Sequence, residues 1–533
     1  MKLSNDELLN KNQWIEKGYH IPEYNRQEVM NRTKKNPIWL HLGAGNIFRA
    51  LPAKMHQQLL NEGETDKGII VAEGFDYEIV EKAYRPFNNL SLLATLKSDG
   101  SIEKDVIGSV TESLLMNTYG DADFKRLQEV FEADSLQMVS LTITEKGYSL
   151  VDSKGEFLDV VKQDFESGPQ EVVSYMGKIA SLLYSRYKKS KSPIALVSMD
   201  NVSHNGALLK ETIIKFTDAW IENELISSDF KEYLTDSTKV SFPWTMIDKI
   251  TPHPDIAVQE ILEEDGVEDI SIIQTEKNSV TAPFVNAEEA EYLVIEDQFP
   301  NGRLSLEKAG IIFTDQETVD KIETMKVTTC LNPLHTALAI YGCLLGYKTI
   351  YETMKDPNLV KLVKGVGYLE GLPVVVDPKI ISPKNFIDEV INVRFINPFI
   401  ADTPQRIATD TSQKIAIRFG QTIKSYANKG KVEELEYIPL VLAGWLRYLM
   451  GINDQGNKME LSPDPLLNDI VPILNKISLG HSESIEEKIK PIIKRTEIFG
   501  VDLYNVGLAN KVIFYFKKLI KGTGAVKNTL QGI

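Results

Sequence analysis

One stretch in the middle of the chain gathers side chains that could move a proton and bind a substrate oxygen. Lys326, Asn332 and His335 stand among small and apolar residues at the start of an apolar helical pattern. A lysine in apolar surroundings holds its proton less tightly and can act as an acid or a base near neutral pH. Asn332 and His335 are three residues apart, so a helix would present both on one side of its first turn. Taken singly, each residue also fits a snorkelling lysine or a satisfied core histidine.

Two other segments place polar residues beside apolar ones, where a hydrophobic core would be destabilised by them. Asn201 follows the strand-like run 193–198, and its amide could join that of Asn332 in polarising a carbonyl without taking a proton. Taken alone, Asn201 is better explained by an Asx turn. Asp248 is flanked by apolar residues, which indicates a buried, paired carboxylate. Its partner could be Lys249 or the backbone, with no part in chemistry.

A third segment, residues 394–414, supplies cations. Arg406 and Lys414 could bring positive charge to a polyhydroxylated or anionic substrate. Surface ion pairs with Asp402 and Asp410 are the alternative.

A nucleotide signal stands near the N-terminus. Gly43 and Gly45 follow the apolar run 38–42 and open a helical stretch that continues to Leu60. Glycines there allow a tight turn and let backbone N–H groups approach a pyrophosphate at the helix N-terminus. Phe48 occupies the place of the third glycine of the usual fingerprint.

A second strand, 68–72, is followed by two acidic residues, Glu73 and Asp76. Either could bind the adenosine ribose hydroxyls and repel a 2′-phosphate, which favours NAD over NADP. Their alternative role is to cap the next helix.

The elements around these residues predict an α/β chain. Strand-like runs at 92–96, 137–143 and 193–198 alternate with helical segments 122–133 and 172–187, which indicates a parallel sheet covered on both faces. After about residue 300 amphipathic helices dominate, at 319–325, 334–345, 351–354, 385–395, 412–427, 438–450 and 505–519. We therefore predict two domains, 1–310 and 311–533.

Composition excludes several classes of protein. The 533 residues carry a net charge of −16, which argues against a nucleic-acid-binding protein. Two cysteines and seven histidines offer neither a disulfide scaffold nor an obvious metal site. No apolar run of membrane-spanning length and no signal-peptide pattern is present, so we expect a cytoplasmic protein without a membrane partner.

In order along the chain, these segments resemble the long-chain polyol dehydrogenase (mannitol dehydrogenase) family. The matching pieces, which run from residue 40 to residue 414, are 41–50, 142–148, 200–206, 247–252, 326–335 and 397–414. The resemblance implies a Rossmann-like, doubly wound N-terminal domain, a mostly α-helical C-terminal domain, and an active site between them. It also implies metal-free hydride transfer with NAD, in a monomer or small homo-oligomer.

The resemblance implies a role for each matching residue. Lys326 would be the general acid–base, Asn201 and Asn332 the oxyanion hole, His335 a substrate-orienting residue, and Glu323 a proton relay to solvent. Substrate contacts would come from Asp248, Arg406 and Lys414. Cofactor contacts would come from Gly43, Gly45, Asn46, Phe48, Arg49, Glu73 and Asp76.

The chain also departs from the family. Members usually have four residues between the lysine and the asparagine, whereas here residues 327–331 make five. The segments 210–240 and 256–290 look inserted and have no assigned purpose.

For the substrate, the resemblance and the cations Arg394, Arg406 and Lys414 favour a sugar acid, with interconversion of D-fructuronate and D-mannonate. Tagaturonate reduction and mannitol 2-dehydrogenation are the alternatives, and a nucleotide-binding sensor without chemistry is the non-enzyme alternative.

Overall fold

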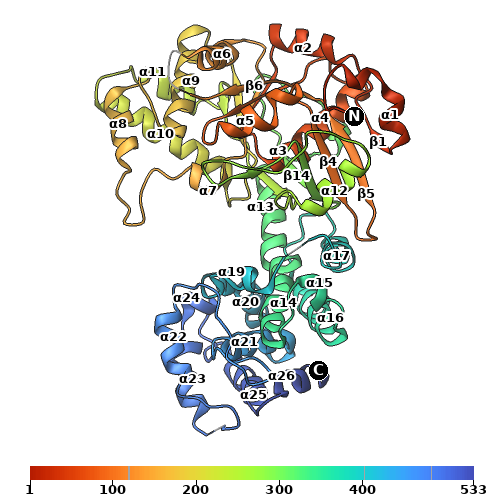
Figure 1. Ribbon diagram of the computed structural model, residues 1–533. Helices are drawn as coiled ribbons and strands as arrows, with labels where there is room; N and C mark the ends of the chain where they lie inside the picture. The colour runs from red at the N-terminus through yellow and green to blue at the C-terminus, as the bar shows by residue number, and fades with distance from the viewer. Residues whose placement is uncertain (118–120, 401, 482) are drawn as a thin grey trace. The chain divides into compact units, whose positions relative to one another are not determined.

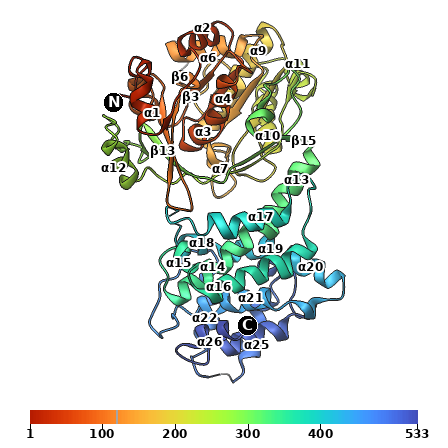
Figure 2. The same cartoon turned by 90° about the vertical axis from the view of Figure 1, so that its right-hand side faces the viewer.

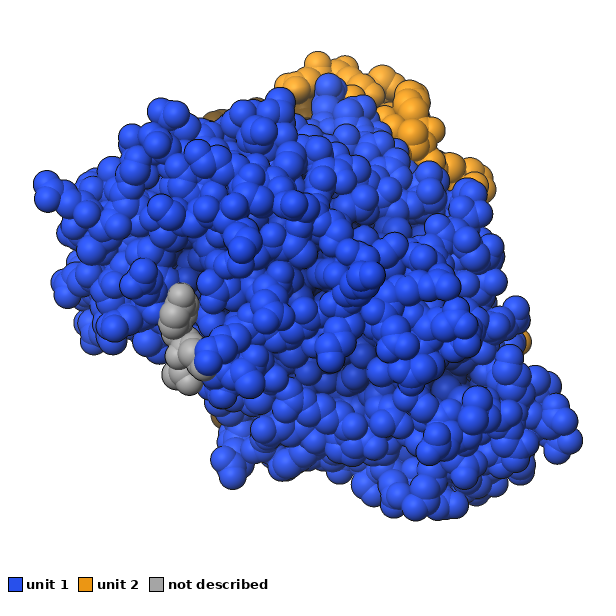
Figure 3. Space-filling model, turned by 90° about the horizontal axis from the view of Figure 1, so that it is seen from above, with its two compact units in different colours: residues 1–97, 101–320 blue, residues 98–100, 321–533 orange. Residues whose placement is uncertain are grey.

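The chain divides into two compact units. The structure, a computed structural model, describes residues 1–117, 121–400, 402–481 and 483–533. Unit 1 comprises residues 1–97 and 101–320, and unit 2 comprises residues 98–100 and 321–533 (Figure 3). The units divide after residue 320 rather than near residue 310, because β15 (Ile312–Thr314) pairs in parallel with β14 (Tyr292–Glu296) and so stays with unit 1.

A six-stranded parallel sheet forms the centre of unit 1 (Figure 1). In spatial order its strands are β6 (Val110–Leu115), β3 (Ile69–Glu73), β2 (Trp39–Leu42), β7 (Met138–Leu141), β8 (Ile194–Ser198) and β9 (Val240–Ser241). All five pairings are parallel. Every residue of β2, β3, β7 and β8 is buried, as expected of a parallel sheet covered on both faces. The α/β prediction is therefore confirmed.

Strand periodicity divides the core of unit 1 into two apolar clusters. Ile69 and Val71 of β3 belong to one cluster, and Ile70 and Ala72 to the other. Successive strand residues point to opposite faces, so each face of the sheet is covered separately. The cluster with Ile70 packs on α6 (Ala122–Glu132), α9 (Tyr175–Lys189) and α10 (Asn205–Glu222). The other cluster packs on α3 (Asn46–Ala50) and α4 (Pro52–Asn61).

Three smaller sheets complete unit 1. The first is four-stranded, in the order β1 (Tyr19–His20), β5 (Ile102–Ile107), β4 (Ser91–Leu96) and β13 (Phe284–Glu288). The second joins β10 (Thr245–Asp248), β14 and β15, and the third is the hairpin β11 (Ile273–Gln274) and β12 (Val280–Thr281). The sequence predicted the run 92–96 as part of the parallel sheet. It is a strand, β4, but it pairs antiparallel with β5 and parallel with β13.

The remaining helices of unit 1 are short. They are η1 (Glu7–Leu9), α1 (Lys11–Glu16), α2 (Arg26–Lys35), α5 (Glu78–Ala83), η2 (Arg85–Phe87), α7 (Thr144–Gly147), α8 (Asp159–Ser167), α11 (Asp229–Thr235), α12 (Ile256–Glu264) and η3 (Leu306–Ala309). The helix α13 (Gln316–Met325) runs across the boundary between the two units.

Unit 2 is built of helices around α14 (Asn332–Leu345; Figure 2). The residues of α14 from Pro333 to Leu344 are nearly all buried. Among the helices packed against it are α16 (Pro357–Lys364), α18 (Pro404–Ala408), α19 (Thr411–Arg418) and α21 (Tyr437–Tyr448). The other helices are α15 (Ile350–Thr353), η6 (Leu372–Val374), α17 (Pro383–Glu389), α20 (Gly420–Asn428), η8 (Val432–Glu434), α22 (Leu467–Leu474), α23 (Ile485–Ile493), α24 (Thr496–Phe499), α25 (Ala509–Leu519) and α26 (Ala525–Gln531). This confirms the mostly helical C-terminal part.

In the described part of unit 2, three segments adopt π-helical geometry: η4 (Lys326–Cys330), η5 (Gly365–Gly371) and η7 (Val390–Arg394). Such turns are rare and often mark functional positions. Within the described residues, no helix combines the length and the apolar character needed to cross a membrane.

Candidate active site

The loop between β2 and α3 has the geometry of a phosphate-binding turn. Gly43 has a φ of +103°, and a Cβ placed on it would lie 2.2 Å from the carbonyl oxygen of Thr142. A side chain at this position is therefore excluded twice, by backbone conformation and by space. Gly45 is the N-cap of α3, and a Cβ there would meet no atom within 4 Å. The backbone at Gly45 is thus open to a ligand that approaches the helix N-terminus.

Glu73, at the end of β3, braces this loop. Its Oε2 accepts a hydrogen bond from the backbone N–H of Ala44 at 2.8 Å. Its Oε1 accepts from the N–H groups of Phe75 at 2.8 Å and Asp76 at 3.1 Å. The carboxylate therefore joins the phosphate loop to the end of the neighbouring strand, a structural duty that the ribose interpretation did not foresee.

Asp76 is buried and is also held in place. Its Oδ2 accepts a 2.6 Å hydrogen bond from the hydroxyl of Thr275, a residue 199 positions later in the chain. Both Asp76 and Glu73 line the cavity described below.

Three residues predicted to contact the cofactor, Asn46, Phe48 and Arg49, belong to α3, the helix that follows the glycine loop. Phe48 is fully buried and stacks on His41, with ring centroids 4.0 Å apart. Arg49 is buried too; it donates to the carbonyl of Ala282 at 2.7 Å and to Asn46 Oδ1 at 2.8 Å. None of the three is among the residues that line the cavity.

A cavity of about 660 Å³ lies at the carboxyl ends of β2, β3 and β7, in the size range of ligand sites. Its lining comprises Gly43, Gly45, Glu73, Phe75, Asp76, Ile79, Thr142–Thr144, Lys146, Gly147, Ser149, Leu150, Leu158, Val160, Val161, Ser174–Met176 and Ser279. The glycine turn, the open helix N-terminus and the acidic residues after the second strand are the features that a dinucleotide needs. The residues present therefore fit NAD.

Asp200 holds two residues of the cavity lining in place. Its carboxylate accepts from the N–H groups of Ile143 at 3.0 Å and Thr144 at 2.8 Å, and from the hydroxyl of Tyr148 at 2.7 Å. Thr144 has a φ of +63°, a strained value for a β-branched residue. Burial raises the pKa of Asp200, while these hydrogen bonds act against that rise. The bonds to Asp200 hold the strained turn in place.

Asn201 and Asp248, the other predicted site residues of unit 1, differ in exposure. Asn201 is exposed after β8, next to Asp200. Asp248 is buried at the end of β10. The adjacent Lys249 is paired with Glu291, at 2.8 Å from Oε2, and donates to the carbonyl of Glu288 at 2.6 Å.

Lys326 begins the π turn η4 and is only 3% exposed. The N–H of Leu331 bonds to the carbonyl of Lys326 at 3.1 Å, five residues back, as the π geometry requires. Asn332 is then the first residue of α14. The wider turn gives room to the fifth residue between Lys326 and Asn332. Glu323 lies three residues before Lys326 on α13, and is partly exposed.

His335 lies in a charged cluster on α14. Its Nε2 is 3.5 Å from Asp402 Oδ2, and its ring packs on Phe395 with centroids 5.2 Å apart. Burial lowers the pKa of His335 to about 4; Asp402 opposes the change, and the guanidinium groups of Arg418, Arg406 and Arg394 add to it. The positive charges of three arginines therefore favour the neutral form of the His335 imidazole.

The predicted substrate cations belong to the same cluster. Arg406 pairs with Asp402 and is 66% exposed, and Lys414 donates to the carbonyl of Thr409 at 2.6 Å. Burial lowers the pKa of Lys414, and Arg418 adds to the effect. Arg418 itself was missed. It stands four residues after Lys414, so the helical spacing could have placed it on the same face.

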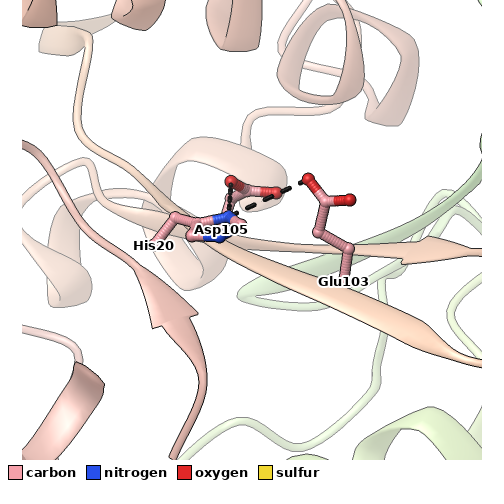
Figure 4. A group of neighbouring side chains, drawn as sticks. All are labelled: His20, Glu103 and Asp105. Carbon is pink, nitrogen blue, oxygen red and sulfur yellow. Dashed lines mark hydrogen bonds and ion pairs between the residues drawn. The ribbon is translucent and has the colours of Figure 1, made fainter. Parts of the chain in front are cut away.

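Side chains of the types that hold metal ions meet between β1 and β5. Among the described residues, one group of His, Cys, Asp or Glu lies close enough to hold an ion: His20, Glu103 and Asp105, on β1 and β5 (Figure 4). His20 Nδ1 is 3.1 Å from Asp105 Oδ1, and Lys97 Nζ is 2.7 Å from Glu103 Oε2. A cation is therefore already paired with one carboxylate, and this group is an ion-pair cluster between strands.

The predicted site residues thus fall into two groups. Unit 1 contains Asn201, Asp248 and the residues of the cofactor cavity. Unit 2 contains Lys326, Asn332, Glu323 and the cluster of His335 with Arg406 and Lys414.

Comparisons with known proteins agree with this arrangement. A model of the mannitol dehydrogenase Rossmann domain matches residues 37–308, and one of the mannitol dehydrogenase C-terminal domain matches residues 318–519. The chain is 50% identical to a D-mannonate oxidoreductase of Thermotoga maritima, over 100% of this chain and 99% of that protein. It is 30% identical to a D-mannonate oxidoreductase of Escherichia coli, over 87% and 89%. Among solved structures, a Pseudomonas fluorescens mannitol 2-dehydrogenase in complex with NAD and D-mannitol matches with a TM-score of 0.69 and 28% identity, over 100% and 99%.

Proposed function

The chain belongs to the mannitol dehydrogenase family, and from this premise we propose that it interconverts D-fructuronate and D-mannonate with NAD. It is an NAD-dependent oxidoreductase that acts on a polyol or sugar acid. The 50% identity to a D-mannonate oxidoreductase, which extends over the whole chain, supports a sugar acid as the substrate. The structural observation that carries the choice is the pair of arginines near His335. Arg406 pairs with Asp402, whose carboxylate also lies 3.5 Å from His335 Nε2. Arg418 donates to the hydroxyl of Thr336, the next residue of α14, and guanidinium groups suit a carboxylate.

The nucleotide site of this proposal is the cavity of unit 1. The N–H groups at the start of α3 bind the pyrophosphate, and Asp76 binds the adenosine ribose. Glu73 acts by holding the loop of Gly43 and Gly45 to the end of β3. When bound, NADH supplies the hydride and NAD⁺ accepts it.

The proton moves through residues of the chain. In the reducing direction Lys326 delivers a proton to the ketone oxygen, and in the oxidising direction it takes the proton from the alcohol. The amides of Asn201 and Asn332 donate hydrogen bonds to that oxygen and stabilise its developing charge. Glu323, one helical turn from Lys326, passes the proton to solvent.

His335 and the cations orient the substrate. The neutral imidazole can donate a hydrogen bond to a sugar hydroxyl or accept one from it. Arg406 and Lys414 hold the carboxylate, and Asp248 accepts hydrogen bonds from hydroxyl groups. No step needs a metal ion, because the ammonium of Lys326 and the two amides provide the positive charge and the dipoles.

The test is to follow NADH oxidation with D-fructuronate, D-tagaturonate and D-fructose, each with and without EDTA. We expect fructuronate to have the highest kcat/KM and EDTA to leave it unchanged. Turnover of fructose alone would reject the uronate assignment, and preference for tagaturonate would reject the assignment to D-mannonate. Loss of activity with EDTA, restored by a divalent cation, would reject the metal-free mechanism.

A further inference from the structure

The hairpin of β11 and β12 belongs to a segment, 256–290, for which the sequence offered no purpose. The hairpin strands are two residues each, Ile273–Gln274 and Val280–Thr281, joined by residues 275–279. A two-stranded hairpin of this size is not stable alone. Contacts with the rest of unit 1 must therefore hold the hairpin, and the residues that its tip contacts indicate its role.

Thr275, at the start of the tip, bonds to Asp76. Thr275 Oγ1 donates to Asp76 Oδ2 at 2.6 Å and accepts from the N–H of Ser279 at 3.0 Å. Both Thr275 and Asp76 are buried. The hydroxyl thus links the carboxylate after β3 to the turn of the hairpin and fixes the orientation of that carboxylate.

Lys277 secures the neighbouring aromatic residue. Its Nζ donates to the carbonyl of Phe75 at 2.5 Å and lies 4.6 Å from the centroid of the Phe75 ring. The N–H of Glu276 adds a 3.3 Å hydrogen bond to Glu78 Oε1. Three consecutive hairpin residues therefore contact the four-residue segment Phe75–Glu78.

The held segment faces the cavity. Phe75, Asp76 and, from the hairpin, Ser279 line it, and the residue Phe75 remains 63% exposed. In a doubly wound sheet the end of the second strand meets the adenosine half of a dinucleotide. An exposed phenyl ring at that place offers a flat apolar face on which a base can stack.

We propose that the β11–β12 hairpin is an adenosine-binding element: it holds Asp76 for the ribose hydroxyls and Phe75 as a platform for the adenine ring. The proposal rests on the proposed function, since it places NAD in the unit 1 cavity. Asp76 binds ribose only in the orientation that Thr275 imposes. Thr275 and Lys277 are thus positioning residues, and Phe75 is a cofactor-binding residue.

The experiment compares Thr275→Val with Thr275→Ser, which keeps the hydroxyl, and with Gln274→Ala, an exposed hairpin residue outside the contacts described. Titration calorimetry with ADP-ribose and with NADH measures affinity without turnover. We expect Thr275→Val to weaken both ligands about three- to tenfold, the range of one lost hydrogen bond. Phe75→Ala should weaken them about tenfold or more, because stacking is lost. Thr275→Ser and Gln274→Ala should bind as the parent does.

Turnover separates this proposal from the substrate assignment. In Thr275→Val we expect the KM for NAD to rise while kcat and the KM for D-mannonate stay unchanged. Parent-like affinity for ADP-ribose in both Thr275→Val and Phe75→Ala would overturn the proposal. If fructuronate and mannonate are not substrates but the ADP-ribose losses occur, the substrate assignment fails and the hairpin proposal stands.

Discussion

The carboxylate of Glu73 accepts a 2.8 Å hydrogen bond from the backbone N–H of Ala44, which lies between the two glycines of the phosphate loop. The same carboxylate accepts hydrogen bonds from the backbone N–H groups of Phe75 and Asp76. The Glu73 oxygens therefore act as acceptors in all three bonds. This one side chain therefore holds both the loop proposed to bind pyrophosphate and the segment proposed to bind adenosine.

Glu73→Gln should release one of the two, because the amide keeps one accepting oxygen while its NH₂ cannot accept, which leaves a buried N–H without a partner. We expect a loss of about 1–3 kcal/mol in the free energy of unfolding and weaker NADH binding. Urea unfolding and fluorescence titration with NADH measure the two effects. Glu81→Gln, on the exposed side of α5, is the matched control. Parent-like NADH binding in Glu73→Gln would contradict the bracing role.

Lys326→Ala should remove the acid–base group and spare the cofactor. We expect kcat to fall about 10²- to 10⁴-fold, with the Kd for NADH unchanged, because the cavity residues all belong to unit 1. Steady-state kinetics and NADH titration check this. Lys424→Ala, on the exposed face of α20, should have parent kinetics. A kcat in Lys326→Ala close to that of the parent would remove Lys326 from the mechanism.

Arg406→Met should discriminate between substrates. A charge-assisted hydrogen bond to the carboxylate is lost, so the KM for fructuronate should rise about ten- to hundredfold. A neutral ketose such as fructose has no carboxylate, so the kcat/KM for fructose should hardly change. Arg495→Met, whose guanidinium pairs with Glu497, is the control. Equal losses for both substrates would mean that Arg406 does not contact the carboxylate.

His335 should be neutral throughout the range in which an ordinary histidine titrates. Its pKa is lowered from 6.5 to about 4, so the profile of kcat/KM should show no step near pH 6.5 that depends on this residue. The unfolded chain binds a proton below pH 6.5, whereas folded His335 does not until about pH 4. Stability from this residue is therefore complete above pH 6.5 and is lost as the pH falls towards 4.

The loss amounts to up to about 3 kcal/mol. The measurement compares the urea midpoints of the parent and of His335→Asn at pH 7.5 and pH 4.5. We expect the parent midpoint to fall further than that of the variant, because the buried His41 and His56 contribute equally to both proteins. An equal fall would show that His335 is protonated in the folded protein.

The sequence predicted those strands of the central sheet that are marked by a local apolar run. The apolar run before Gly43 is β2, and the run before Glu73 is β3. The strand β4 was found but assigned to the wrong sheet, because its partners β5 and β13 are set by packing and not by local pattern. In unit 2, the helix expected at 412–427 is two helices, α19 and α20, with a break at Phe419.

The site residues show the same division. The residue types of Gly43 and Lys326 pointed to chemistry because few structural roles require them in those surroundings. The bracing bonds of Glu73 and the contact of Thr275 with Asp76 could not be predicted, since their partners come together only in the fold. Arg418, in contrast, could have been predicted from its helical spacing of four residues from Lys414.

The π turn at Lys326 has a consequence for recognising such enzymes in genomes. A local widening of the helix accommodates one more amino acid without breaking the helix-to-helix connection. A search pattern that demands a constant count between lysine and asparagine would discard this protein. Patterns that permit a single gap after the lysine would retain it, together with any other homologue in which the same insertion occurs.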